Sequence, residues 1–544
     1  TKSLSRYIFL ILLFFIATFH IQNLKLMPLE GYDEVNFIQR AEVSSWPLPD
    51  WAPLYVFFQK FLFLIFHNPI QVYYANHILM VSSVSLCIYL LLYKLKAPLL
   101  SQLLIPIITL LIGINFLTLV KVNHFNFTLI TLLLTFTISK NFKLSNKMLI
   151  SSIGLLLLCY VRQDNLVPSI LLGFSGLFIH HRSGLSLNHT SIKRYFSILI
   201  VILIGITQYS PFNSERSFSP FKANLAKYIN NQTHDKQNKK VIINKSFSTQ
   251  DSFTNFFKSN PKLIIEYLFS NFSFWIFQLK DLLTFHYPLI YVPRDFFLST
   301  LIDYIIWGIM LVLLKVVYCK NKIFFPRNIS ITENEKYLTY ILVVFFIKTS
   351  ITISLYGSLV TRYSFEIVIL FLFYSLYFLF KIIFEKKFLN SKGIIIIVSI
   401  ILLLTYIVRL NSLSSDISKY YLPIQRQLKE NIQVVSTYTS PNERQSIFSL
   451  DYISTYLNDR PKALLTPFNI PEGCLVLCED ASVSNVFQTF EKSKIDLIIL
   501  DNLTISALIE VFGLKDFNEF TSKIPENHFF KKYSSKEITI WQRR

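Results

Sequence analysis

Ionisable side chains stand beside long apolar segments of this 544-residue chain, where a charge is costly and therefore informative. An acidic pair, Asp33-Glu34, follows the first apolar segment. Residues that stand beside later segments are Lys121 and His124, Arg162 and Asp164, and Arg362. Carboxylates that converge with several cations suit an anionic, phosphate-bearing ligand and a nucleophile that must lose a proton.

Each of these positions also has a structural explanation. An ion pair at a helix end explains Arg162 and Asp164 equally well, and Lys121 suits a side chain that reaches the lipid headgroups. A lone histidine such as His124 is more often structural than catalytic. The acidic pair suits a solvated loop or the first turn of a helix. Only the whole set indicates a functional site.

The elements that must position these residues are membrane helices. The chain is 52% hydrophobic and 16% charged, whereas soluble proteins carry about a quarter of charged residues. A spanning helix needs about 20 apolar residues. About eleven segments approach this length: 4–21, 74–93, 99–119, 125–139, 148–161, 166–180, 195–209, 296–318, 337–359, 364–384 and 393–410. We predict a polytopic α-helical membrane protein whose first span is not cleaved.

The net charge of +20 reflects how the chain is oriented in the membrane, and it does not indicate a nucleic-acid partner. Basic residues recur in alternate short connections, which places the N-terminus in the cytoplasm and the acidic pair outside. We therefore expect an integral protein of a bacterial plasma (inner) membrane, surrounded by membrane lipids and without nucleic acid. Outside segments of the membrane module 1–410 are 22–73 and 210–293, and residues 252–280 predict an interfacial helix.

Residues 411–544 form a predicted second domain outside the membrane. Their 15 basic and 16 acidic residues nearly cancel. We expect strands at 446–450, 474–478, 495–500 and 537–541, with helices at 451–457, 483–492 and 505–512. Strands that alternate with helices favour a small, mostly parallel α/β sheet.

Four short motifs occur in a characteristic order: Gly31-Tyr32-Asp33-Glu34, Asp50-Trp51-Ala52-Pro53-Leu54-Tyr55, Tyr160-Val161-Arg162-Gln163-Asp164-Asn165 and Thr361-Arg362-Tyr363. Together with the predicted topology, they resemble the GT-C glycosyltransferases that use polyprenyl-phosphate sugars. This branch includes lipid A aminoarabinose transferase, protein O-mannosyltransferases and RgtA/B/C/D-like enzymes. One proline of the family's Pro-Pro-Leu-Tyr is replaced by Ala52, and Glu-Lys-Pro is absent. These departures favour the RgtA/B/C/D-like side.

The resemblance implies an inverting hexosyl or pentosyl transfer from a polyprenyl-phosphate-sugar donor to a lipid, glycan or protein acceptor. Neighbouring residues on a helix point about 100° apart, so Asp33 and Glu34 are not the opposed carboxylates of a glycosidase. We expect Asp33 to act as general base and Glu34 to position the acceptor. This pair is also a candidate site for a divalent cation, the one cofactor that the sequence suggests. Residues expected to bind the donor phosphate are Arg162, Arg362 and Lys121. Residues expected to contact the acceptor or support the site are Asp50, His124, Asp164 and Tyr55.

Three other functions compete with this one. An O-antigen ligase or polymerase is also polytopic, but those enzymes resemble one another in placing Arg and His in a large late outside loop, whereas the acidic pair here is in the first. A secondary transporter shows paired repeats and helices broken at the midplane, and no clear repeat occurs here. A structural or sensory membrane protein is the third alternative.

Overall fold

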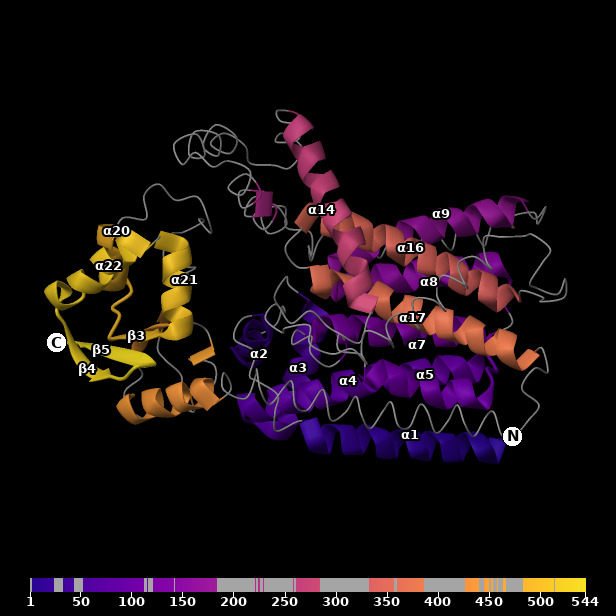
Figure 1. Cartoon of the computed structure of the whole chain (residues 1–544), viewed down its shortest axis with the longest axis horizontal. Helices are drawn as coiled ribbons and strands as arrows, with labels where there is room; N and C mark the ends of the chain where they lie inside the picture. The colour runs from indigo at the N-terminus through magenta and orange to yellow at the C-terminus, as the bar shows by residue number, and fades with distance from the viewer. Residues whose placement is uncertain are drawn as a thin grey trace.

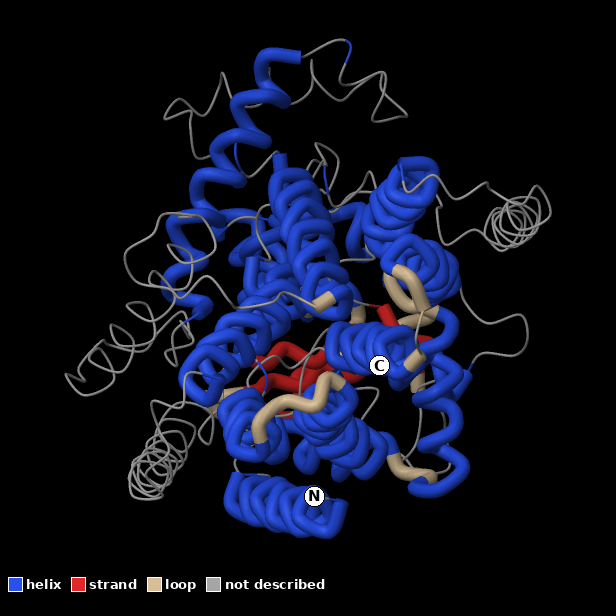
Figure 2. The backbone as a smooth tube through the Cα atoms, turned by 90° about the vertical axis from the view of Figure 1, so that its right-hand side faces the viewer, coloured by secondary structure: helices blue, strands red, loops and turns tan. Residues whose placement is uncertain are grey.

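The computed structural model describes residues 2–23, 33–43, 52–111, 115, 121–140, 142–182, 221, 224–225, 228, 258, 261–283, 332–356, 360–385, 426–439, 445–449, 452–453, 457, 463–465, 483–512 and 514–544. Long helices lie side by side along the longest axis, and a sheet lies beyond one end of them (Figure 1). Figure 2 views the same helices end-on.

The helices of this bundle coincide with the apolar segments of the sequence. They are α1 (Lys2–Asn23), α4 (Pro69–Lys94), α5 (Leu99–Leu111), α7 (Val122–Ser139), α8 (Leu144–Leu157), α9 (Leu166–Arg182), α16 (Glu333–Tyr356) and α17 (Val360–Glu385). Within the described residues, three stretches are long and apolar enough to cross a membrane: Pro69–Lys94, Val122–Ser139 and Glu333–Leu355. This agrees with a helical membrane protein. The predicted spans 195–209, 296–318 and 393–410 lie outside the described residues.

Three further helices flank the bundle. Two of them, α2 (Asp33–Val43) and α3 (Pro53–Phe66), lie between α1 and α4 in the sequence. The third, α14 (Pro261–Leu283), begins inside the predicted interfacial segment 252–280 and ends three residues beyond it. One side of α14 packs against the bundle, because Trp275 is fully buried and its Nε1 donates to Ser364 Oγ at 3.0 Å. Phe269 on the same helix is 70% exposed, so α14 has one packed and one open face.

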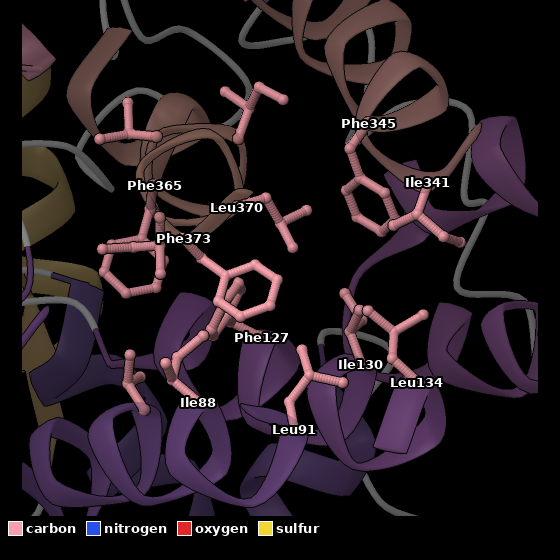
Figure 3. Close-up of a cluster of buried hydrophobic side chains, with 14 of the residues drawn as sticks. Ile88, Leu91, Phe127, Ile130, Leu134, Ile341, Phe345, Phe365, Leu370 and Phe373 are labelled. Carbon is pink, nitrogen blue, oxygen red and sulfur yellow. The ribbon is translucent and has the colours of Figure 1, made fainter. Parts of the chain in front are cut away.

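An apolar core joins α4, α7, α16 and α17 (Figure 3). Phe127, Ile130 and Leu134 recur on α7 at the spacing of one helix face, and all three are buried. Facing them are Phe345 of α16 and Phe373 of α17, which are also buried. In a membrane such packing stabilises the bundle through van der Waals contact, because lipid is as apolar as these side chains.

Two ion pairs join α16 and α17 near opposite ends of the pair. Lys381 Nζ of α17 lies 2.6 Å from Glu335 Oε1 of α16. Lys348 Nζ of α16 pairs in turn with Glu366 Oε2 of α17. In each helix the glutamate lies nearer the N-terminus than the lysine. Because each glutamate pairs with the lysine of the other helix, the two helices run antiparallel.

The C-terminal strands form one mixed sheet. They are β1 (Ser446–Phe448), β2 (Ala463–Leu465), β3 (Leu497–Asp501), β4 (Phe529–Ser534) and β5 (Ile538–Arg543), in the order β2-β1-β3-β5-β4. Strand β1 pairs in parallel with β2 and β3, whereas β5 pairs antiparallel with β3 and β4. The prediction of a mostly parallel sheet is therefore wrong for half of the pairings. The short turn between β4 and β5 explains one of the two antiparallel pairings, because it permits only an antiparallel hairpin.

A helix formed by residues 426–438 accompanies the sheet, and so do α20 (Val483–Lys492), α21 (Asn502–Phe512) and α22 (Leu514–Lys523). Helix α20 has the predicted bounds, and α21 begins three residues before the predicted one. The predicted strand at 474–478 lies outside the described residues. Strands β2 and β4 were not predicted.

Candidate functional site

Glu34 is the centre of a buried polar cluster. Its side chain is fully buried, on the first turn of α2. Tyr55 Oη donates to Oε1, and so do Gln59 Nε2 at 2.8 Å and Asn76 Nδ2 at 2.7 Å. The backbone N–H of Lys121 donates to Oε2 at 2.9 Å. Because these donors come from α3, α4 and the start of α7, Glu34 joins three helices to α2.

Two of the predicted cations, Lys121 and Arg162, are held at the start of α7. Lys121 precedes the first residue of α7, and its side chain is 1% exposed. Arg162 Nη1 donates to Asn123 Oδ1 in the first turn of the same helix. The ring of His124 lies against Phe365 of α17, with centroids 4.2 Å apart. These contacts define what we call the site end of the bundle.

Arg362 belongs to the same end. It lies in the first turn of α17, three residues before Phe365. The side chains of Asp33 and Arg362 and the whole of Asp50 lie outside the described residues, so the structure gives only the backbone of the first two. Asp33 is the first residue of α2 and the direct neighbour of Glu34.

A network of alternating charges extends from Arg162 into the bundle. Arg162 contacts Asp164 twice, through Nε at 3.1 Å and Nη2 at 2.8 Å. Lys348 Nζ lies 3.3 Å from Asp164 Oδ1 and also pairs with Glu366. Asn126 Nδ2 donates to Glu366 Oε1, and Lys348 donates to Asn165 Oδ1 at 3.0 Å. Two acids and two bases balance, so the network is neutral as a whole.

Lys348, Glu366 and Asn76 were missed from the sequence, although the first two left a signal. Lys348 is a single base inside the apolar segment 337–359, and Glu366 a single acid near the start of 364–384. A charge at such a position is a functional candidate by default. Asn76, in contrast, is an ordinary amide within an apolar segment, and no sequence signal separates it from its neighbours.

Histidines extend the polar cluster towards α1. His124 Nε2 lies 2.6 Å from the carbonyl oxygen of Asn115. The ring centroids of His20 and His77 are 6.2 Å apart, and His20 Nε2 lies 3.0 Å from Ser82 Oγ. Within the described residues, no group of three or more His, Cys, Asp and Glu side chains is arranged to hold a metal ion.

Burial and neighbouring charge shift two groups that lie outside the spanning helices. Burial lowers the pKa of Lys121 to about 7, an effect that Glu34 opposes. Burial would raise the pKa of Asp164, but Arg162 and Lys348 outweigh it and hold that pKa below its ordinary value. Asp164 is therefore a carboxylate at neutral pH, and it compensates much of the charge of Arg162.

No protein-family model matches the sequence, and comparison with curated proteins finds no similar one. The function must therefore be inferred from the site end itself.

Proposed function

We propose that the protein is an inverting membrane glycosyltransferase of the GT-C type. It moves a sugar from a polyprenyl-phosphate donor to a lipid, glycan or protein acceptor at the outer face of a bacterial plasma membrane. The observation that carries this proposal is the meeting of α2, which begins with Asp33, and the start of α7, where the Lys121 backbone bonds Glu34 and Arg162 bonds Asn123. About eleven spans and an outside domain at 411–544 belong to the same proposal.

The site end suits a phosphate anion. The N-termini of α7, α9 and α17 carry or adjoin residues of this site. A helix N-terminus holds a partial positive charge and unpaired N–H groups, which favour an anion. Lys121 and Arg362 add full charges to two of these termini, whereas Arg162 is already neutralised by Asp164.

The reaction needs one base and one stabilised leaving group. An acceptor hydroxyl oxygen attacks the anomeric carbon, and a new glycosidic bond forms as the bond from that carbon to the phosphate oxygen breaks. Asp33 takes the hydroxyl proton, and polyprenyl phosphate leaves with the bonding electrons. General base catalysis of this kind contributes about 10²- to 10⁴-fold.

Glu34 suits a supporting role better than a metal ligand. Its Oε1 already accepts three hydrogen bonds and its Oε2 accepts one. An ionised carboxylate has about four acceptor positions, so little capacity remains for a divalent cation. We therefore assign Glu34 to the placement of α2 and of the neighbouring Asp33.

The test is a direct assay with the purified full-length protein. Polyprenyl-phosphate sugars of several kinds are added with membrane lipid extract as acceptor, and release of polyprenyl phosphate is followed. Release that depends on the protein and on the acceptor supports the proposal. Unchanged donor throughout the panel would contradict it, and donor that crosses a vesicle membrane intact would indicate a transporter instead.

Arg362→Ala is expected to raise KM for the donor by about tenfold or more, because a charge-assisted hydrogen bond contributes about 1.5–3 kcal/mol. The measurement is initial rate against donor concentration. Arg182→Ala serves as the matched control, since Arg182 ends α9 and lies beside Phe178 instead of the site end. A change in acceptor KM alone would show that Arg362 does not bind the donor.

Donor binding is expected to weaken as the pH rises through about 7. The ammonium of Lys121, whose pKa burial lowers to about 7, loses its charge there, while a donor phosphodiester stays ionised. Binding to wild type should fall by up to about tenfold per pH unit above 7. Lys121→Arg keeps its charge and should show a flat profile between pH 6 and 9. Parallel profiles for the two proteins would exclude Lys121 as the titrating group.

The lowered pKa of Lys121 affects the free energy of unfolding in the opposite direction: stability rises with pH where donor binding falls. The unfolded chain regains the ordinary lysine pKa of 10.5. Between about pH 7 and 10.5 it therefore binds more protons than the folded chain, and the contribution of Lys121 to the free energy of unfolding rises with pH.

A further inference from the structure

Helix α2 lies between two different apolar cores. Glu34 and Phe37 point to the side of the helical bundle, where Phe37 belongs to the main core. Val35 and Ile38, the next residue in each case, belong to a second core. All four side chains are fully buried. Because successive residues of a helix point about 100° apart, α2 presents one face to each core.

The second core is built mainly by the C-terminal residues. Leu428, Ile432 and Val435, spaced by four and three, line one face of the helix formed by residues 426–438. Ile499 of β3 and Ile540 of β5 add one face of the sheet. This core also includes Leu62 of α3 and Val72 of α4. The sheet and the short helix that begins with Asp33 therefore share one apolar core.

An eleven-residue helix depends on such packing for its order. Isolated helices shorter than about 12–15 residues are marginal in water, and α2 has 11 residues. The hydrogen bonds of Glu34 tie its start to α3, α4 and α7, but they act at a single residue. Val35 and Ile38 provide the contact on the other side, and the two sets together fix the rotation of α2.

We propose that the C-terminal sheet positions the acidic pair through α2, with Val35 and Ile38 as the positioning residues. In this arrangement the sheet is an essential part of the active site, and loosening its contact with α2 displaces Asp33 more than the donor-phosphate residues, which lie on other elements. The kinetic part of this inference rests on the proposed function. The coupling between sheet and α2 does not.

Two neighbouring residues of β3 provide a matched test of the coupling. Ile499 faces the core shared with α2, whereas Ile498 faces the core between the sheet and α20 and α22; both are fully buried. In the full-length protein, Ile499→Ala is expected to speed hydrogen exchange of the α2 amides about tenfold or more, and Ile498→Ala less than about twofold. Equal exchange in the two variants would overturn the coupling.

A second matched pair tests the positioning role. Val35 of α2 and Val486 of α20 are both fully buried, and Val486 lies in the core away from α2. Val35→Ala is expected to lower kcat about tenfold or more with donor KM changed less than about twofold. The conservative variant Val35→Ile is expected to have a kcat close to that of wild type. Val486→Ala should leave kcat within about twofold. Equal kcat losses, or a loss confined to donor KM, would overturn the positioning role.

A failure of the proposed function and a failure of the positioning role give different results. If wild type transfers no sugar, the proposed glycosyltransferase function fails, while the exchange comparison still decides whether the sheet holds α2. If wild type is active and Val35→Ala matches it in kcat, the function stands and the positioning role is wrong.

Discussion

Asp33→Asn is expected to lower kcat by at least about 100-fold, because the amide has nearly the shape of the carboxylate but cannot take the acceptor's proton. Folding should be retained, since Glu34 keeps the buried hydrogen bonds that tie this helix end to its neighbours. Donor binding should also remain, because the cations proposed to contact the phosphate lie on other elements.

The measurement is single-turnover transfer together with donor affinity. Glu42→Gln provides the matched control: it removes a carboxylate from the exposed last turn of the same helix. We expect it to retain activity within about twofold. Substantial transfer by Asp33→Asn would mean that another group removes the proton, and a loss of donor binding would mean that Asp33 acts before the chemical step.

Lys348→Met is expected to destabilise the protein by about 3–5 kcal/mol, the usual result of removing one partner of a buried ion pair. The side chains of Lys348 and Glu366 are only 2% and 3% exposed, so the remaining carboxylate of Glu366 would be left without its cation. Asp164 would keep Arg162 as its only described cation.

A double variant tests whether the loss of stability comes from the unpaired charge. The double variant Lys348→Met with Glu366→Gln removes one base and one acid, and it should recover most of the lost stability in thermal unfolding. Lys336→Met, on the exposed face of the same helix, should change stability by no more than about 0.5 kcal/mol. A double variant as unstable as Lys348→Met would show that shape, and not charge, decides the effect.

The apolar pattern predicted the described helices closely because each depends on local sequence. The segments 74–93 and 125–139 fall within α4 and α7, and α20 has the predicted bounds. The sheet was predicted less well. In β4 only Phe529 is buried, and the remaining residues are exposed or half-buried. Such an edge strand lacks the alternation that identifies a strand with one buried face.

The sequence singled out several residues of the buried polar clusters, but not most of their contacts. Arg162, Lys121 and the acidic pair were recognised from their places beside apolar segments. Their partners are distant in the chain: Glu34 and Asn76 are 42 residues apart, and Lys348 and Asn165 are 183 apart. Such contacts depend on how the helices pack, and a single sequence carries no record of that packing.

The ion pairs between α16 and α17 have a consequence for how these helices align. Glu335 and Lys348 are about 20 Å apart along α16, and Glu366 and Lys381 about 22 Å apart along α17. The facing surfaces are largely Phe, Leu and Ile, which would still pack if one helix slid along the other by a turn. That slide of 5.4 Å would separate both ion pairs at once. Charges that add little net stability thus select a single register for helices whose apolar side chains are nearly interchangeable.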